Sequence, residues 1–128
     1  MIQRKSKVAK VVPLPKLLKK TQEVFNRWIR ERDADDLCIS CGNYHDAYDA
    51  GHYVPVGHGK GSLLRFHEWN VNKEGKSCNA FDDFHLIGYR KRLIDKIGLE
   101  SVEWLEANRN VVKKWTRDEL YEIIKRYS

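Results

Sequence analysis

The chain has 128 residues, of which 41% are hydrophobic and 33% charged, and these values predict a single soluble domain with a modest core. No apolar run approaches the roughly 20 residues that cross a bilayer, and no apolar segment of the signal-peptide type follows the N-terminal charges. We therefore expect no membrane partner and a cytoplasmic location. In that compartment the three cysteines are expected to serve metal or redox chemistry rather than disulfides.

The formal net charge of +6 is concentrated at the N-terminus. The first 20 residues hold seven basic residues and no acidic one, so the other 108 carry about −1. Residues 1–13 are expected to form a flexible basic arm ahead of one domain over 14–128. This distribution favours a nucleic-acid partner, because neutralising phosphates releases counterions. A solubilising tail is the alternative.

The first periodic segment runs from Leu14 to Arg32. Its apolar residues fall at helical spacing, which predicts an amphipathic helix with one buried stripe: Leu14, Leu18, Thr21, Phe25 and Trp28, with Leu17, Val24 and Ile29 beside them. The opposite face is basic and offers three candidate contacts to a phosphate backbone: Lys16, Lys19 and Lys20.

A Cys-x-x-Cys-Gly sequence, Cys38 to Gly42, follows this helix and is typical of a zinc knuckle. Two thiolates at this spacing bind one ion through a tight turn, and glycine permits the backbone reversal. A thioredoxin-like redox motif is the rival, but it requires a following helix, and the residues after Gly42 favour a turn.

A zinc site needs further ligands, and the only other cysteine is Cys78. The position that would complete a second Cys-x-x-Cys pair is Gly75. Three thiolates are therefore available, and the fourth ligand has three candidates: His45, Asp82 and His85. The alternative is that zinc does not bind and the cysteines are small buried hydrophobic residues.

The segment Tyr48–Val54 suits a strand interrupted by Gly51. It contains His52, and a histidine near an acid such as Asp49 is a candidate general base with a metal ligand beside it. A purely structural histidine is the alternative. The glycine-rich loop that follows, residues 57–61, carries Lys60, whose charge and neighbouring amides suit a phosphate.

A second strand is expected over Leu63–Trp69, followed by Asn70 and a short polar link. A helix is then expected from Asn79 to Ile97, with a basic face formed by Arg90, Lys91 and Arg92. These three and Arg65 are further candidate DNA contacts.

The C-terminal part is expected to be structural. Gly98 is a plausible helix C-cap, and Val102–Asn108 is expected as a short helix with Ser101 as N-cap and with Trp104 and Leu105 inward. The final helix opens with a capping box of Thr116 and Glu119, with its apolar residues at helical spacing: Leu120, Ile123, Ile124 and Tyr127.

The order strand, loop, strand and helix resembles the ββα-metal nuclease motif of the HNH type, an α+β fold. In such chemistry His52 would take a proton from water, and the carbonyl of Asn70 would orient His52 by a hydrogen bond. Asn79 would help to hold one divalent cation that stabilises charge on the phosphate.

The chain also resembles the phage NinG/Rap recombination nucleases over roughly Phe25 to Tyr127. The resemblance is carried by several motifs: Phe25-Asn26-x-x-Ile29-Arg30-x-Arg32-Asp33, Cys38-Ile39-Ser40-Cys41-Gly42, Asp49-Ala50-Gly51-His52-Tyr53, Arg65-Phe66-x-Glu68-x-Asn70-Val71, Cys78-Asn79 and Tyr89-Arg90-x-x-Leu93-Ile94-x-x-Ile97-Gly98.

That resemblance implies a structure-specific DNA endonuclease that acts on D-loops and Holliday junctions with Mg²⁺ or Mn²⁺, encoded by a phage or prophage. It implies His52 as general base, Asn70 as its orienter and Asn79 as metal ligand, with Asp49 as a secondary candidate. The zinc ligands would be Cys38, Cys41 and Cys78. Cutting a four-way junction requires two coordinated cuts, which would suit a homodimer. The alternatives are a DNA-binding module without catalysis and a zinc-knuckle domain that binds protein.

Overall fold

A computed structural model describes residues 11–57 and 62–128 of the chain. Most of the expected basic arm, and Lys60, lie outside the described residues. The elements follow one another as α1 (Leu14–Arg32), β1 (Tyr48–His52), the 3₁₀ turn η2 (Ser62–Leu64), β2 (Val71–Gly75), α2 (Lys76–Phe81), α3 (His85–Ile97), α4 (Leu99–Ala107) and α5 (Arg117–Tyr127). None of the described helices is both long and apolar enough to cross a membrane.

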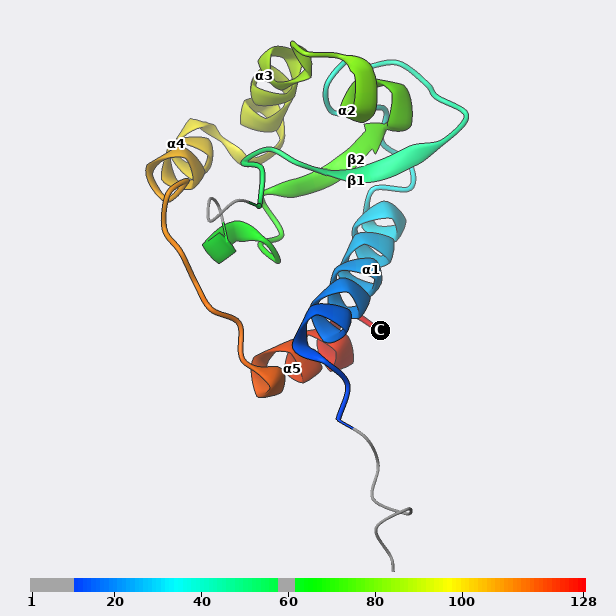
Figure 1. The fold of residues 1–128 in the computed structure, drawn as a ribbon. Helices are drawn as coiled ribbons and strands as arrows, with labels where there is room; N and C mark the ends of the chain where they lie inside the picture. Colours follow the sequence, from blue (N-terminus) through cyan, green and yellow to red (C-terminus); the bar gives the residue numbers. More distant parts are fainter. Residues whose placement is uncertain (1–10, 58–61) are drawn as a thin grey trace, which may run out of the picture.

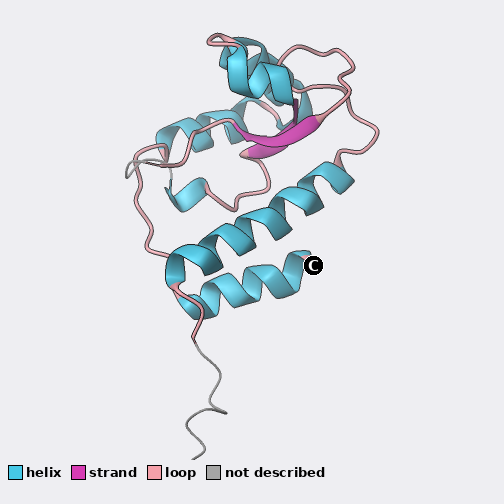
Figure 2. Cartoon of the chain, turned by 45° about the vertical axis from the view of Figure 1, so that its right-hand side comes forward, coloured by secondary structure: helices cyan, strands magenta, loops and turns pink. Residues whose placement is uncertain are grey.

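The two strands form an antiparallel hairpin in the middle of the molecule (Figure 1). Tyr48 pairs with Gly75 and His52 with Val71. Helix α1 covers one face of the hairpin, while α2 and α3 lie on the other side (Figure 2). Helix α5 packs against α1, so the first and last helices are neighbours. The observed class is α+β, as predicted.

Apolar side chains gather in two clusters. The first joins α1 and α5 to the hairpin, with buried residues Leu17, Phe25, Ile29, Ala50, Phe66, Val71, Leu120 and Tyr127. The second joins the β1–β2 connection to α3 and α4, with buried residues Ile39, Tyr53, Val54, Leu64, Tyr89, Leu93, Val102 and Leu105.

Helix α1 has the predicted bounds, Leu14–Arg32. Its buried residues are spaced by three or four positions, which is the stripe that a helix presents to a core: Leu17, Thr21, Phe25 and Ile29. Phe25 is central, since its ring lies 5.8 Å from that of Phe66 and 4.8 Å from that of Tyr127. Leu14, placed in the stripe by the sequence, is 42% exposed because it lies in the first turn.

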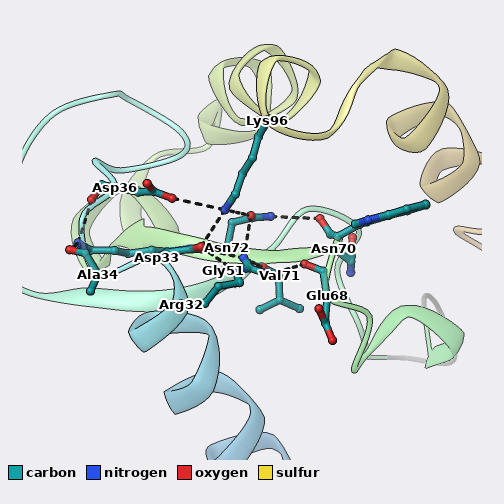
Figure 3. A network of polar contacts seen from close by, with 12 residues as sticks. Arg32, Asp33, Ala34, Asp36, Gly51, Glu68, Asn70, Val71, Asn72 and Lys96 are labelled. Atoms are coloured by element: carbon teal, nitrogen blue, oxygen red, sulfur yellow. Dashed lines mark hydrogen bonds and ion pairs between the residues drawn. The ribbon is translucent and has the colours of Figure 1, made fainter. Parts of the chain in front are cut away.

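A polar network fixes the end of α1 to the hairpin and to α3 (Figure 3). The buried carboxylate of Asp33 pairs with Arg32 at 2.7 Å and with Lys96 at 2.9 Å. It also accepts the backbone N–H of Lys73 at 3.1 Å. Burial alone would raise the pKa of Asp33, but the hydrogen bonds and charges of Arg32 and Lys96 outweigh it and lower that pKa.

The second strand lies later in the chain than predicted. Leu63–Trp69 is not a strand: Leu64 belongs to η2 and to the second cluster, whereas Phe66 enters the first. The strand is Val71–Gly75, which the sequence analysis took for a polar link. Its polar side chains are buried because α3 supplies their partners.

Those partners are specific. Asn72 donates to the hydroxyl of Tyr89 at 3.1 Å, and Glu74 contacts His85 at 2.6 Å. A strand whose buried positions are polar shows no apolar alternation, so periodicity does not find it.

The helix predicted over Asn79–Ile97 is two helices. Helix α2 ends at Phe81, and α3 begins at His85. Between them Asp82 accepts the backbone N–H of Phe84 at 2.9 Å through its side chain, a local bond that competes with helix continuation. Asn79 is therefore inside α2 rather than at a helix start.

The C-terminal boundaries are close to those predicted. Gly98 has φ of +89° and ends α3, as predicted, but it also precedes α4, which begins at Leu99. Ser101 is thus inside α4 and is not its N-cap. Leu105 is buried, whereas Trp104 is 42% exposed and does not point inward as predicted. The capping box of α5 is confirmed, with both reciprocal bonds of Thr116 and Glu119 present.

Candidate metal centre and catalytic residues

Four side chains converge beside the end of the hairpin. Ligand atoms of Cys38, Cys41, His45 and Cys78 all lie within 4.8 Å of one another, and within residues 11–57 and 62–128 no other such group of three or more His, Cys, Asp or Glu occurs. The knuckle turn closes by a bond of 2.8 Å from Gly42 N–H to the Cys38 carbonyl, and Gly42 has φ of +73°. Glycine suits this left-handed conformation.

His45 is the fourth member of the cluster. Its Nε2 lies 3.0 Å from Cys41 Sγ and 3.6 Å from Cys78 Sγ. Of the three candidates for a fourth ligand, the structure thus brings in His45. Asp82 belongs to the α2–α3 turn and His85 pairs with Glu74, so neither joins the cluster.

The ring of His45 occupies the space that a side chain at Gly75 would need. A Cβ placed on Gly75 would lie 2.5 Å from three atoms of the imidazole. The lack of a cysteine at position 75 therefore leaves no empty space in the cluster, because the His45 ring fills it. The imidazole stands where a fourth cysteine would otherwise project.

The surroundings favour the thiolate of Cys38 but oppose that of Cys78 as long as no cation is bound. Burial opposes ionisation of Cys38, but hydrogen bonds from Ser40 and from the Gly75 amide lower the pKa of Cys38 to about 6. Burial raises the pKa of Cys78 to about 12. The other ring nitrogen of His45 lies 3.3 Å from the Ser77 hydroxyl, the kind of outer contact that fixes a ligating histidine. Three sulfurs and one nitrogen suit a tetrahedral metal such as zinc.

His52 ends β1 and is held by the backbone. Its Nε2 lies 3.0 Å from the carbonyl oxygen of Arg65. A carbonyl only accepts, so Nε2 carries the proton and donates, which leaves the lone pair of the neutral ring on Nδ1. Burial lowers the pKa of His52, and the nearby charge of Arg65 adds to this effect. The structure therefore favours a neutral imidazole at neutral pH.

Asn70 does not orient His52 as the sequence analysis expected. Its fully buried side chain accepts the N–H of Val54 at 2.8 Å and donates to the Val54 carbonyl at 3.0 Å and the Leu64 carbonyl at 3.3 Å. These three backbone groups lie in the connection between the strands, so Asn70 closes that connection. His52 takes its orientation from Arg65 instead, because the backbone at that point already presents a carbonyl.

Asp49 and Asn79 are brought together. The Asn79 amide donates to Asp49 Oδ2 at 3.1 Å, and the Lys76 ammonium contacts Oδ1 at 2.6 Å. Burial opposes ionisation, but Lys76 and Asn79 outweigh it and lower the pKa of Asp49. Strand alternation puts Asp49 on the face of β1 opposite to that of Ala50 and His52. The two predicted halves of the catalytic site therefore lie on opposite faces of one strand.

A second polar couple, Glu74 with His85, lies on the Asp49 face of the hairpin and was not predicted. Glu74 is fully buried and contacts His85 Nδ1 at 2.6 Å, while its Oε1 has no hydrogen-bond partner in the described residues. That oxygen lies over Gly51, where an added Cβ would be 2.1 Å away. The signal that could have pointed to Glu74 is its position opposite Asp49 in the strand register. That register was not predicted, because the second strand was placed too early in the chain.

The predicted basic face of α3 is mostly engaged elsewhere. Arg90 pairs with Glu106 at 2.7 Å, and Arg92 donates to the Ser40 carbonyl at 2.7 Å, where it holds the knuckle. These two are therefore structural. Lys91 and the α1 lysines remain exposed: Lys16, Lys19 and Lys20.

Comparison with known proteins adds a family. The family model described as "Bacteriophage Lambda NinG protein" matches residues 2–128. The proteins called "Protein ninG" of Escherichia phage lambda and Escherichia phage 933W are each 39% identical over 126 residues, and that of Salmonella phage P22 is 36% identical. These matches cover 96% of this chain but only 60% or 61% of each relative, so the chain spans about three fifths of their length. No solved structure matches.

Proposed function

This chain belongs to the NinG family of bacteriophage proteins, and on that premise we propose that it is a metal-dependent DNA endonuclease that cuts branched recombination intermediates. In this proposal His52 is the general base, and Asp49 and Asn79 are ligands of the catalytic cation. Asn70 stabilises the connection between β1 and β2 instead of orienting His52. The observation that carries it is the state of His52.

His52 has the properties of a general base. Burial lowers its pKa and so favours the neutral imidazole, its Nε2 donates to the Arg65 carbonyl, and its Nδ1 has no hydrogen-bond partner within the described residues. A fixed ring with one available lone pair can accept a proton from water.

In the proposed reaction Nδ1 of His52 takes a proton from a water molecule whose oxygen attacks phosphorus. The new P–O bond forms as the ester P–O bond on the opposite side breaks, and the leaving oxygen departs with the electron pair. Arg65 lies beside His52 and its positive charge is felt at the imidazole. A divalent cation, when bound by the oxygens of Asp49 and Asn79, supplies further charge stabilisation to the phosphate and the leaving oxygen.

Because His52 and Asp49 lie on opposite faces of β1, the DNA must pass the edge of this strand to reach both. In the described residues the sheet consists of β1 and β2 alone, so the outer edge of β1 is not covered by a third strand. A phosphodiester that crosses this edge reaches His52 on one face and Asp49 on the other. Oxygen ligands of this kind suit Mg²⁺ or Mn²⁺, which keep several waters and use few protein ligands.

We propose that the metal cluster stabilises the position of the helix that carries Asn79. Cys38, His45 and Cys78 tie the chain before β1 to the start of α2, and we propose that they hold zinc together with Cys41. In this arrangement zinc fixes α2, and thereby Asn79, against the hairpin.

The test uses a labelled four-way junction and a linear duplex of the same sequence. The protein is incubated with each in Mg²⁺ or Mn²⁺ and in EDTA, beside His52→Ala and the control His67→Ala. Metal-dependent cutting of the junction that is lost in His52→Ala alone is the expected result. Binding of the junction without cutting in either metal would refute catalysis and favour a DNA-binding module, and absence of DNA binding would refute both.

A further inference from the structure

We propose that a hollow beside Arg65 binds a second phosphate of the DNA strand, next to the phosphate that His52 addresses. The hollow has a volume of about 280 Å³ and lies between η2, the start of α1 and the link from α4 to α5. Three cations line it: Arg65, Lys113 and Lys114. This inference rests on the proposed nuclease function and extends it to the C-terminal part of the chain.

Arg65 has no anionic partner among residues 11–57 and 62–128. Its guanidinium makes one long contact, 3.4 Å to the amide oxygen of Gln22, and no ion pair with a described residue. The stretches outside the described residues, 1–10 and 58–61, contain no Asp or Glu. Burial lowers the pKa of Arg65. A half-buried cation without a carboxylate is costly unless an anion arrives from outside.

The link between α4 and α5 is fastened beside Arg65 by Ser62. The Ser62 hydroxyl accepts the N–H of Lys113 at 2.8 Å, and the Ser62 carbonyl accepts the indole N–H of Trp115 at 2.9 Å. The indole also packs edge-on against Phe66 at 5.1 Å. These contacts place two lysines, distant in the sequence, beside Arg65, whose carbonyl holds the proposed base.

The cations differ in how free they are. Lys113 lies 4.8 Å over the ring of Trp115 and contacts Glu119 at 2.7 Å, so part of its charge is already satisfied. Lys114 is exposed and has no ion pair with a described residue. Arg65 and Lys114 are therefore the two cations that an arriving phosphate would neutralise. Arginine binds phosphate with a planar fork of donors, and lysine binds it as a point charge.

The hollow shares Arg65 with the site of the proposed base, which favours a phosphate of the same DNA strand as its ligand. The backbone of Arg65 holds His52 and its side chain lines the hollow, so one residue connects the base with the cations. A DNA strand carries a phosphate at every nucleotide. A strand with its scissile phosphate at His52 therefore brings a neighbouring phosphate to Arg65 and Lys114.

The test is equilibrium binding of a labelled junction without added Mg²⁺ or Mn²⁺, so that no cutting occurs and the proposed zinc is retained, over a series of salt concentrations. The variants are Arg65→Gln, Lys114→Gln, both together and the control Lys125→Gln, which removes an exposed charge elsewhere. Each lost phosphate contact lowers the slope of log affinity against log salt by about 0.9. The double variant is therefore expected to lose about 1.8 in slope, and Lys125→Gln is expected to keep the slope of the original chain.

Arg65→Lys keeps the charge and is expected to keep the slope, and Lys114→Gln changes an exposed position that does not affect folding. A slope for Lys114→Gln and the double variant equal to that of the original chain would overturn this inference while leaving the nuclease proposal intact. If the original chain binds no DNA, the nuclease proposal fails first and this inference falls with it.

Discussion

The exchange of His45 for a cysteine at position 75 tests the metal centre directly. In His45→Ala one of four ligands is lost, and in Gly75→Cys a side chain enters space that the imidazole fills, since its Cβ would lie 2.5 Å from the ring. The double variant removes the ring and introduces a thiolate. Gly75 has φ of −57° and ψ of 137°, a conformation that any residue adopts, so the backbone does not oppose a cysteine there, and the nearest obstacle is the His45 ring.

The magnitudes follow from the number of ligands. Structural zinc sites bind with roughly 10–16 kcal/mol, so an equal share for one of four ligands is about 2.5–4 kcal/mol. At about 1.4 kcal/mol per factor of ten, the zinc affinity of His45→Ala should fall at least about 60-fold. Gly75→Cys should also lose stability, because the clash displaces the ring. In the double variant four thiolates restore a closed site, and zinc affinity should return to within about tenfold of the original.

The assay is competition for zinc with a chelator of known affinity, combined with thermal unfolding and elemental analysis of the bound metal. His67→Ala, which changes a histidine outside the cluster, is the matched control. If His45→Ala holds zinc as tightly as the original chain, His45 is not a ligand. If the double variant is as weak as either single variant, the idea that the imidazole takes the place of a fourth cysteine is wrong.

Two further predictions concern Asn70 and His52. Asn70→Ala leaves the buried backbone groups of Val54 without their partners, so the free energy of unfolding, measured by urea denaturation, should fall by about 3 kcal/mol. A loss below about 0.5 kcal/mol would contradict the proposed role of Asn70 as a brace. Burial holds the pKa of His52 below the ordinary value of 6.5, so His52 stays neutral to lower pH than a free histidine. The acidic limb of the cleavage rate against pH should therefore have its midpoint below 6.5, and a midpoint above that value would exclude His52 as the base.

Local signals predicted the outer helices well. The stripe of α1 and the capping box of α5 are encoded within a few turns of chain, and both elements appear where the sequence placed them. The strand β1 was also found, because Tyr48 to His52 is flanked by turn residues. These elements depend little on which distant segment packs against them.

The second strand could not be found in the same way. Its burial depends on Asn72 and Glu74 meeting Tyr89 and His85, which lie in a helix that follows it. A polar residue carries no sign of a distant partner, so the segment looks like a link. The apolar residues of Leu63–Trp69 gave the opposite error, because they serve two separate clusters rather than one sheet face.

The candidate site was predicted in its parts but not in its arrangement. The zinc-type cysteines converge as their spacing indicated, and the fourth member was one of three named alternatives. Asp49 and Asn79, the two candidate ligands of the catalytic cation, are hydrogen-bonded to each other, and their role as metal ligands stays a prediction. Whether His52 shares a face with them depends on strand alternation at a single residue, and the carbonyl that holds His52 belongs to a backbone whose path no side-chain pattern describes.

The close approach of the Glu74 side chain to Gly51 limits which substitutions this hairpin can accept during evolution. A side chain at position 51 requires the Glu74 carboxylate to move, because its Oε1 would lie 2.1 Å from the new Cβ. Loss of that carboxylate would also remove the only acidic contact of His85 in the described residues. We therefore expect a substitution at 51 to be accompanied or preceded by a change at 74, which also releases His85.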